Sequence, residues 1–408
     1  MEITPEGRYP GSASGARRRK WPRPGPIVVR NRAFGRLWIS QFQSNLGTWL
    51  LVVAVPVYVF QLTGSPTSTS IAVVAEAAPA LMFAPLGGLL ADRWSRRLVM
   101  AGSDAVRMAC VLGMLLASRA GLVWVVYAAV FAENGVAQFF DPAYGAIVPQ
   151  IVGRSADLDE ASSWSSAASG AVRLAGGPVG GLLYGVVGFR WLVAADAATY
   201  LISALLLLGI AVPPTRPNAP GAPRSRSGLL AELAGGVAFL RRDIVLRRLL
   251  MMSALFLFGN GALSAILVPY AERALHRGAG TIGLLMSALG AGYLAGAYVG
   301  RRLTRTGRLR HGTACCLAAV TGAFAGLFNC DQIGLALMFI ALAGVPGAAL
   351  LLLVRVQVQR KAPDLVLGRV MAAYGAMQTA ATVLGAATGG VLAARCMDLL
   401  QQFFRNRR

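Results

Sequence analysis

Apolar segments of about 20 residues recur along this chain, and each is long enough to cross a lipid bilayer as a helix. Hydrophobic residues make up 56% of the 408 residues and charged residues only 14%, which is far more apolar than a soluble domain. We predict an all-α polytopic membrane protein with about 11 transmembrane helices, at residues 37–61, 69–91, 98–118, 122–141, 165–187, 191–212, 247–270, 281–300, 312–330, 333–354 and 370–394.

The basic residues are concentrated in alternate loops. The formal net charge of +22 would suit a nucleic-acid-binding protein, but the Arg and Lys residues do not gather on one face. They indicate membrane topology instead, because loops rich in Lys and Arg stay on the cytoplasmic side. We therefore expect a multi-pass protein of the cytoplasmic membrane with a cytoplasmic N-terminus. The connections on the other side carry fewer cations, namely Arg119, Arg190, Arg273 and Arg277.

A linker rich in Pro, Gly and Ser divides the predicted spans into six and five. We expect a basic cytoplasmic tail at 1–36, a six-helix bundle at 37–213, a cytoplasmic linker at 214–246 and a second bundle at 247–408 with a short tail. Within the linker, residues 229–240 have apolar side chains at helical spacing followed by cations. This pattern predicts an amphipathic helix on the inner membrane surface.

The polar residues give no sign of catalytic or metal chemistry. The five cysteines lie in or beside apolar spans without ligand spacing, and His276 and His311 are isolated. The sequence has no nucleotide-binding loop and no constellation of nucleophile, metal ligands or paired acids. We expect no enzyme, no metal site and no cofactor. The expected partners are a small-molecule substrate, protons and membrane lipid, with no nucleic acid.

The run from Gly88 to Arg97, which reads GLLADRWSRR, follows the second apolar span. It resembles the loop signature between the second and third helices of the major facilitator superfamily, with Ser95 at a position where the family usually has glycine. The segments 31–34, 46–49, 61–66 and 139–143 are similar to the branch that holds macrolide-efflux and enterobactin-exporter permeases. This resemblance implies two helical bundles and transport by alternating access. The chain shows no twelfth span, which most relatives have.

The two halves also repeat. The small-residue run at 173–181 in the fifth span is echoed at 382–390 in the eleventh, and a Pro-containing cytoplasmic segment precedes each run. Two pseudo-repeated bundles around a site near the membrane midplane are typical of transporters. Small residues allow close helix approach and proline permits a bend. The candidate packing residues are Gly177, Pro178, Gly180 and Gly181, which resemble an exporter signature with altered spacing.

Asp92 leads a group of candidate gating residues at the cytoplasmic helix ends. Its carboxylate can accept hydrogen bonds from the exposed amides that begin the eleventh span near Gly368, where the helix dipole is positive. The family resemblance implies that this contact breaks during inward opening. We expect Arg96 to reach Asp141 and to hold one bundle together. A purely topological role of the basic loop is the alternative for the set, which is Gly88, Asp92, Arg93, Arg96, Arg97 and Asp141.

Six charged residues within the spans are candidates for coupling or for lining the substrate cavity. Glu76, about 10 Å into the second span, would cost about 2.5 to 3.5 kcal/mol as an anion facing lipid. It is a proton carrier, a counter-charge for a cationic substrate, or a protonated carboxyl bonded to a neighbour. Asp104 and Arg107 are spaced for an ion pair, either structural or coupling. Arg173 could pair with Glu133 or Asp196.

We interpret the chain as a secondary active transporter that exports a small amphipathic molecule, such as a drug, a natural product or a siderophore, with proton antiport as the drive. The alternative is a non-transporting membrane sensor or a truncated, inactive homologue. Eleven spans place residues 395–408 outside, against the positive-inside tendency. Residues 397–404 are then either part of an external tail or a short surface helix, and we expect an exposed groove on the second bundle where a twelfth span would pack.

Overall fold

The computed structural model describes residues 25–117, 119–153, 156–210, 238, 243–275, 279–306, 309–362 and 367–405. Every regular element within these residues is helical. The first half contains α1 (Ile27–Arg30), α2 (Arg32–Thr63), α3 (Pro66–Arg93), α4 (Arg96–Gly113), α5 (Val123–Val152), α6 (Ala156–Val187) and α7 (Phe189–Leu208). The second contains α9 (Ile244–Pro269), α10 (Ala279–Thr306), α11 (Leu309–Phe328), α12 (Ile333–Lys361) and α13 (Leu367–Arg405).

Eleven of these helices correspond to the eleven predicted spans. Eight are long and apolar enough by themselves to cross a membrane, and α6 qualifies as a span bent by 42° between Gly177 and Val179. The prediction of about 11 transmembrane helices in an all-α fold is confirmed. Several helices extend beyond the predicted spans because their ends are polar: α2 begins at Arg32 and α12 continues to Lys361. The predicted linker helix at 229–240 lies outside the described residues.

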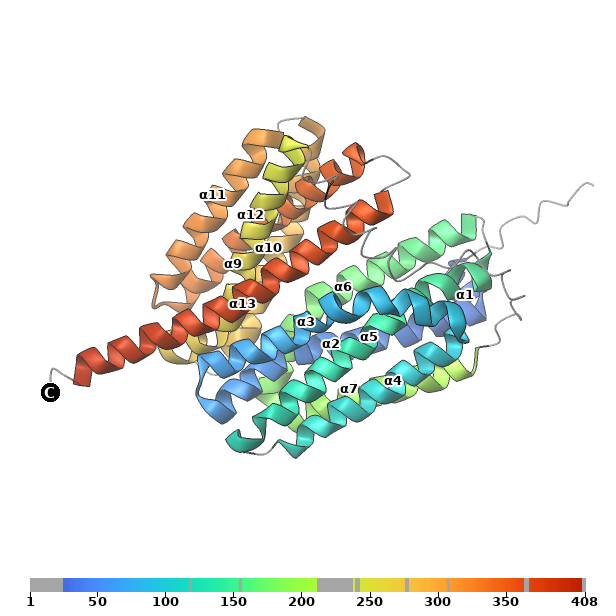
Figure 1. Ribbon diagram of the computed structural model, residues 1–408, viewed down its shortest axis with the longest axis horizontal. Coiled ribbons are helices and arrows are strands. Elements are labelled where there is room, and N and C mark those ends of the chain that lie inside the picture. Colours follow the sequence, from blue (N-terminus) through green and yellow to red (C-terminus); the bar gives the residue numbers. More distant parts are fainter. Residues whose placement is uncertain are drawn as a thin grey trace, which may run out of the picture.

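The helices form two bundles with the same internal arrangement (Figure 1). In the N-bundle (α1–α7), α2 packs on α6, α3 on α5, and α4 on α5. In the C-bundle (α9–α13), the equivalent pairs are α9 with α13, α10 with α12, and α11 with α12. In addition, α7 packs on α2 and α4, whereas no described helix packs in that way on α9 and α11. Exposed side chains on α9 include Met251, Leu255 and Phe258.

Glycines at repeated positions explain why the two bundles fit together. A Cβ at Gly176 of α6 would overlap Trp49 of α2, and one at Gly385 of α13 would overlap the backbone of Phe258 on α9. Five residues further along, Gly181 lies against Gly283 of α10, and Gly390 lies against Ser70 of α3. Each repeat therefore uses its first glycine within its own bundle and the later one across the bundle interface. The sequence echo between 173–181 and 382–390 has this packing as its physical basis.

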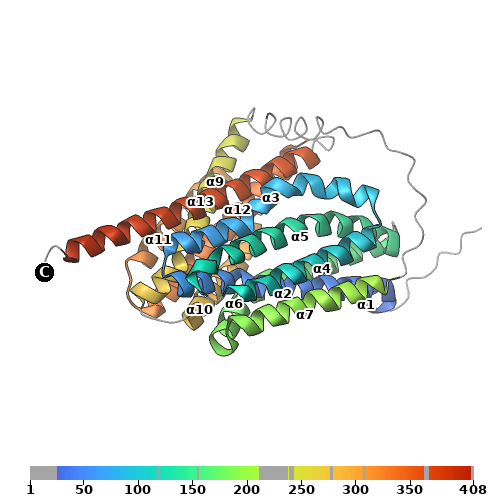
Figure 2. The ribbon, with the colours of Figure 1, turned by 60° about the horizontal axis from the view of Figure 1, so that its bottom comes forward.

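The bundles meet near one membrane face and separate toward the other (Figures 1 and 2). We call the face where α2 begins the basic face, because most of the Arg and Lys residues that the structure describes lie near the helix ends on that side. We call the face where α2 ends the opposite face. One hydrophobic core near the opposite face includes Leu50, Val193, Leu267 and Leu285 from both bundles. Nearer the basic face there are two separate cores, one within each bundle. The two bundles therefore share a core near the opposite face and have separate cores nearer the basic face.

The C-terminal segment continues α13 without a break to Arg405. At about 1.5 Å per residue, this 39-residue helix is longer than the bilayer core of about 30 Å. Figure 1 shows its last turns extending past the neighbouring helices. Residues 397–404 thus belong to α13 in the structure and do not start a separate surface helix.

Candidate functional site

A buried ion pair joins α4 to α5 in the middle of the N-bundle. Arg107 donates from Nε and Nη2 to Oε1 of Glu133, at 2.9 and 2.7 Å. Both residues are about 5% exposed, so water contributes little to their solvation. An isolated buried charge is costly, whereas a hydrogen-bonded pair offsets much of that cost. Glu133 is therefore the primary partner of Arg107.

Two more helices bind to the same ion pair. Tyr200 of α7 donates to Glu133 Oε1 at 2.8 Å, and the Arg107 guanidinium lies over its ring, 4.3 Å from the centroid. Thr48 of α2 accepts from Arg107 at 3.0 Å and is within 2.9 Å of the Tyr200 hydroxyl. Asn134 donates to the other oxygen of Glu133 at 2.8 Å. The pair thus cross-links α2, α4, α5 and α7.

Asp104 is a second acid in contact with this group, and its side chain is fully buried. Its Oδ1 is 3.8 Å from Arg107 and has no hydrogen-bond partner among the described residues. Ser203 of α7 donates to its Oδ2 at 2.5 Å. Asp104 and Arg107 therefore do face each other as their spacing predicts, but the arginine binds Glu133 more closely.

Asp196 of α7 is a third acid and is also fully buried. Thr199 donates to its Oδ1 at 3.2 Å, whereas its Oδ2 has no hydrogen-bond partner in the described part of the chain. The carboxyl lies directly against the backbone of α2 at Gly47, where a Cβ would overlap Oδ1. A carboxylate with one weak donor in a dry site would be strongly destabilised, so we assign Asp196 the protonated, neutral state.

Glu76 of α3 adds a fourth acid on the side of α5. It is half-buried. Among the described residues it makes no hydrogen bond or ion pair. Counting Arg173, whose side chain the structure does not describe, the six candidate coupling residues hold four acids against two arginines. An uncompensated buried charge costs several kcal/mol per ion, so an excess of buried acids favours the protonated form of some of them.

A polar stripe on α5 leads from the group toward the basic face. Asn134, Gln138 and Asp141 follow one another at helical spacing, and Gln138 donates to the carbonyl oxygen of Asn134 at 3.2 Å. Asp141 is exposed and makes no ion pair with a described residue. The stripe therefore places an exposed carboxylate on α5 between the buried acids and the basic face.

The gating candidates are described in part. Arg96 donates to the carbonyl oxygen of Ala146 at 2.9 Å and not to Asp141, so it holds α5 through the backbone. Arg97 donates to the carbonyl oxygen of Ile210 at 2.9 Å, just beyond the C-terminal end of α7, where free carbonyls favour a cation. Gly88, Asp92 and Arg93 lie on α3, but their surroundings, and any contact with Gly368, are outside the described side chains.

The packing candidates all lie on α6. A Cβ added at Gly177 would lie 3.5 Å from the Val53 side chain of α2. Gly180 lies against the backbone of Leu50, and Gly181 against α10. At Pro178 the backbone bends, as expected for proline within a helix, whereas its side chain is not described.

Sequence reasoning named Asp196 on α7 but missed the hydroxyl partners Tyr200 and Ser203 on the same helix. Asp196, Tyr200 and Ser203 stand at positions i, i+4 and i+7 of an otherwise apolar helix, so they share one face. That periodicity could have revealed them. The role of Thr48 could not be predicted, because a threonine within a span commonly bonds its own backbone, as Thr48 also does to Ser44 at 3.0 Å.

Known proteins resemble the chain over most of its length. A sequence model of the Major Facilitator Superfamily matches residues 37–395. The uncharacterized MFS-type transporter YfiS of Bacillus subtilis (strain 168) is 28% identical over 377 residues, which are 90% of this chain and 88% of the relative. The enterobactin exporter EntS of Escherichia coli O6:K15:H31 (strain 536) is 26% identical over 381 residues, 90% of this chain and 87% of the relative.

Two solved structures share the fold at low sequence identity. A bacterial homologue of the human lysosomal transporter Spinster, inward-facing and unoccupied, aligns with a TM-score of 0.65 and 14% identity, covering 90% of this chain and 82% of that one. A bacterial homologue of the iron transporter ferroportin, in an inward-facing state, aligns with a TM-score of 0.65 and 15% identity, covering 88% of this chain and 91% of that one. With the predicted signature run and the family match over residues 37–395, the chain belongs to the Major Facilitator Superfamily and is a multi-pass membrane protein, not an enzyme.

Proposed function

We propose that the chain exports a small amphipathic molecule from the cytoplasm in exchange for protons. The supporting observation is the excess of acids over arginines among the charged residues in the middle of the N-bundle. Glu133 receives four hydrogen bonds from three residues and suits the ionised state. Asp196 and Asp104 each leave one oxygen without a hydrogen bond among the described residues, which suits carboxyls that hold protons.

The separation of the two bundles at the basic face supports an inward-open conformation. Arg30, Arg96, Arg97 and Lys361 lie at that face, and the positive-inside tendency assigns such a face to the cytoplasm. In this conformation the exposed Asp141 contacts the cytoplasm, and the acids behind it can exchange protons with that side. Closing the basic face and parting the glycine contacts at the opposite face would then expose the cavity to the outside.

The substrate class follows from the two walls of the interior. The N-bundle has the partly exposed acid Glu76 and the amides Asn134 and Gln138. The C-bundle has apolar helices with uncharged polar groups, such as Asn260, which accepts a hydrogen bond from Tyr293 at 3.0 Å. Such a cavity suits a molecule with one polar and one apolar side. The similarity to an enterobactin exporter supports export of a drug, natural product or siderophore.

Everted membrane vesicles acidified in their lumen test this proposal. The probes are ethidium, as an amphipathic cation, and enterobactin, the molecule named for a relative. We expect accumulation of at least one probe that collapses when the pH gradient is dissipated and is lost in Asp196→Asn. Accumulation that is unchanged when the pH gradient is dissipated would contradict proton coupling. No accumulation of any compound from a wider growth-inhibition screen would favour a non-transporting sensor or an inactive homologue.

A further inference from the structure

A hollow lies between the bundles at the opposite face. It is a groove of about 1030 Å³ between the bundles, where α2 and α6 end and α7 and α10 begin. Its floor is the close contact of the bundles, where Gly181 meets Gly283 and Gly185 approaches Gly280. Its size suits a drug-sized molecule.

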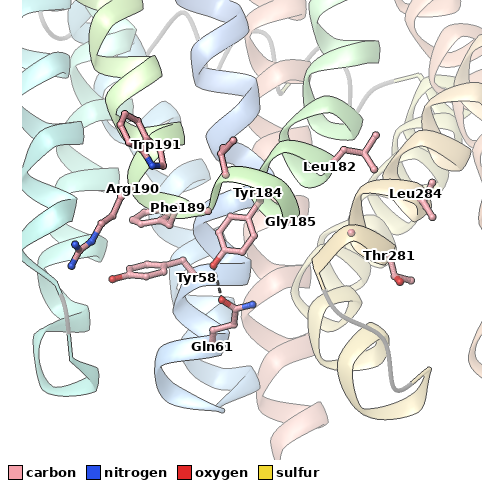
Figure 3. Close-up of a pocket in the computed structure, with 13 residues that line it drawn as sticks. Tyr58, Gln61, Leu182, Tyr184, Gly185, Phe189, Arg190, Trp191, Thr281 and Leu284 are labelled. Carbon is pink, nitrogen blue, oxygen red and sulfur yellow. Dashed lines mark hydrogen bonds between the residues drawn. The ribbon is translucent and has the colours of Figure 1, made fainter.

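Aromatic side chains form one wall of this groove (Figure 3). Tyr58 stacks on Phe189 with a centroid distance of 3.8 Å and an interplanar angle of 6°. Tyr184 lies beside them, 6.5 Å from Phe189 at a tilt of 56°. Figure 3 shows the three rings between Arg190 on one side and Thr281 and Leu284 of α10 on the other. A planar aromatic ligand could therefore stack along this wall.

The polar groups at the groove are mainly hydrogen-bond donors. Tyr184 donates to Oε1 of Gln61 at 2.7 Å, which turns the Gln61 amide nitrogen outward as a donor. Arg190 is exposed, and no described acid lies within salt-bridge distance of it. Trp191, 71% exposed, adds an indole N–H. The Gln61 amide and the Trp191 indole can donate hydrogen bonds, and Arg190 is a cation without an ion-pair partner among the described residues. These groups suit an anion with several hydrogen-bond acceptors.

We propose that this groove binds a planar aromatic anion and that the bound anion holds the opposite face closed. The groove exists only while α10 contacts α6, so a ligand that touches both α10 and the N-bundle side of the groove binds one conformation in preference to the other. By linkage, such a ligand stabilises the state that opens at the basic face. The proposal concerns a site outside the central cavity and does not depend on proton coupling or on the direction of transport.

Calorimetric titration of the purified protein in lipid nanodiscs with naphthalene-2-sulfonate tests the site, with empty nanodiscs subtracted. We expect saturable binding of one anion per chain. Arg190→Gln should weaken it at least about tenfold, since it removes the charge-assisted contact. Arg119→Gln, which removes an exposed arginine on the same face outside the groove, should leave the affinity unchanged. Naphthalene without the sulfonate should not bind saturably.

Hydrogen exchange of residues 279–290 tests the bridging between bundles. Saturating naphthalene-2-sulfonate should slow exchange in these first turns of α10 in the wild-type protein and in Arg119→Gln, but not in Arg190→Gln. Melting curves of the variants without ligand show whether each is folded. Absence of saturable binding, or binding that Arg190→Gln leaves intact, would overturn the site. Binding without slower exchange in α10 would overturn its conformational role.

Discussion

The N-bundle and the C-bundle share one helix arrangement but hold it together by different means. The N-bundle has Arg107, Glu133, Asp104 and Asp196 in its interior, bound to hydroxyl groups on α2 and α7. The described spans of the C-bundle have no charged residue between 312 and 328 or between 333 and 354. There the helices meet through glycine: Gly292 and Gly296 of α10 lie against the backbone of α12.

The two bundles therefore differ in the interactions that hold their helices together in the membrane. In a bilayer, helices gain nothing by hiding apolar side chains from lipid, so association depends on close packing or on interhelical hydrogen bonds. In its described part the C-bundle combines close packing with uncharged hydrogen bonds, such as the one from Tyr293 of α10 to Asn260 of α9. The N-bundle combines close packing, at Gly176 and Gly180 of α6, with a charged interior that such packing does not require. Charge that is not needed for folding is a sign of function.

Replacing Arg107 should have the largest effect on the free energy of unfolding. Arg107→Gln leaves Glu133 buried without its cation, and removing one partner of a buried ion pair typically costs about 3–5 kcal/mol. We expect a loss of that order in the free energy of unfolding, measured by denaturant titration in mixed micelles. The double variant Arg107→Gln/Glu133→Gln should regain much of it. A double variant as unstable as the single one would mean that Arg107 acts mainly through Tyr200 and Thr48.

A glycine substitution in the C-bundle should have the next largest effect. A Cβ at Gly385 would overlap the backbone of Phe258, which cannot move aside as a side chain can. Gly385→Ala should destabilise by about 1–3 kcal/mol, measured in the same titration. Gly322→Ala on α11 is the matched control, since no heavy atom lies within 4 Å of its added Cβ. It should be neutral or stabilise by up to about 1 kcal/mol through helix propensity. Equal effects at both positions would refute close packing as the cause.

Asp196→Asn should change stability by less than about 1 kcal/mol, although the residue is fully buried. The reason is that a carboxyl already holding its proton and an amide are both neutral. Transport driven by a pH gradient should nevertheless be lost, as measured in everted vesicles. If Asp196 is ionised, the substitution should instead change stability by several kcal/mol and alter its pH dependence.

The smallest effect concerns an ion pair at the basic face of the C-bundle. Asp243 caps α9, and Lys361 of α12 donates to it at 2.6 Å, which lowers the pKa of Asp243 below its ordinary 3.8. Because the folded state has the lower pKa, the pair stabilises above about pH 3.8 and loses its contribution as the pH falls through the folded pKa. Asp243→Asn keeps a capping oxygen and should lower the melting temperature slightly, and by more at pH 7 than at pH 3. A shift of equal size at both pH values would remove the ion pair as its cause.

The fold could be predicted from the sequence because a bilayer imposes a strong length and polarity requirement. The eleven helices and the two-bundle repeat follow from the apolar segments and from the echo of 173–181 at 382–390. Helix rotation does not follow from them, and it decides which charges meet. Sequence spacing suggests Asp104 as the partner of Arg107, whereas the rotation of α4 against α5 brings Glu133 closer. The same limit explains why Arg96 was expected at Asp141 and lies at Ala146.

Infrared difference spectroscopy of the purified protein tests most directly whether the N-bundle stores protons. A protonated carboxyl has a carbonyl stretch that is distinct from that of a carboxylate. At neutral pH we expect such a band in the wild-type protein, reduced in Asp196→Asn and in Asp104→Asn but retained in Glu133→Gln. Absence of the band in the wild-type protein at neutral pH would mean that all the buried acids are ionised, which would contradict the proposed role of this bundle in proton exchange.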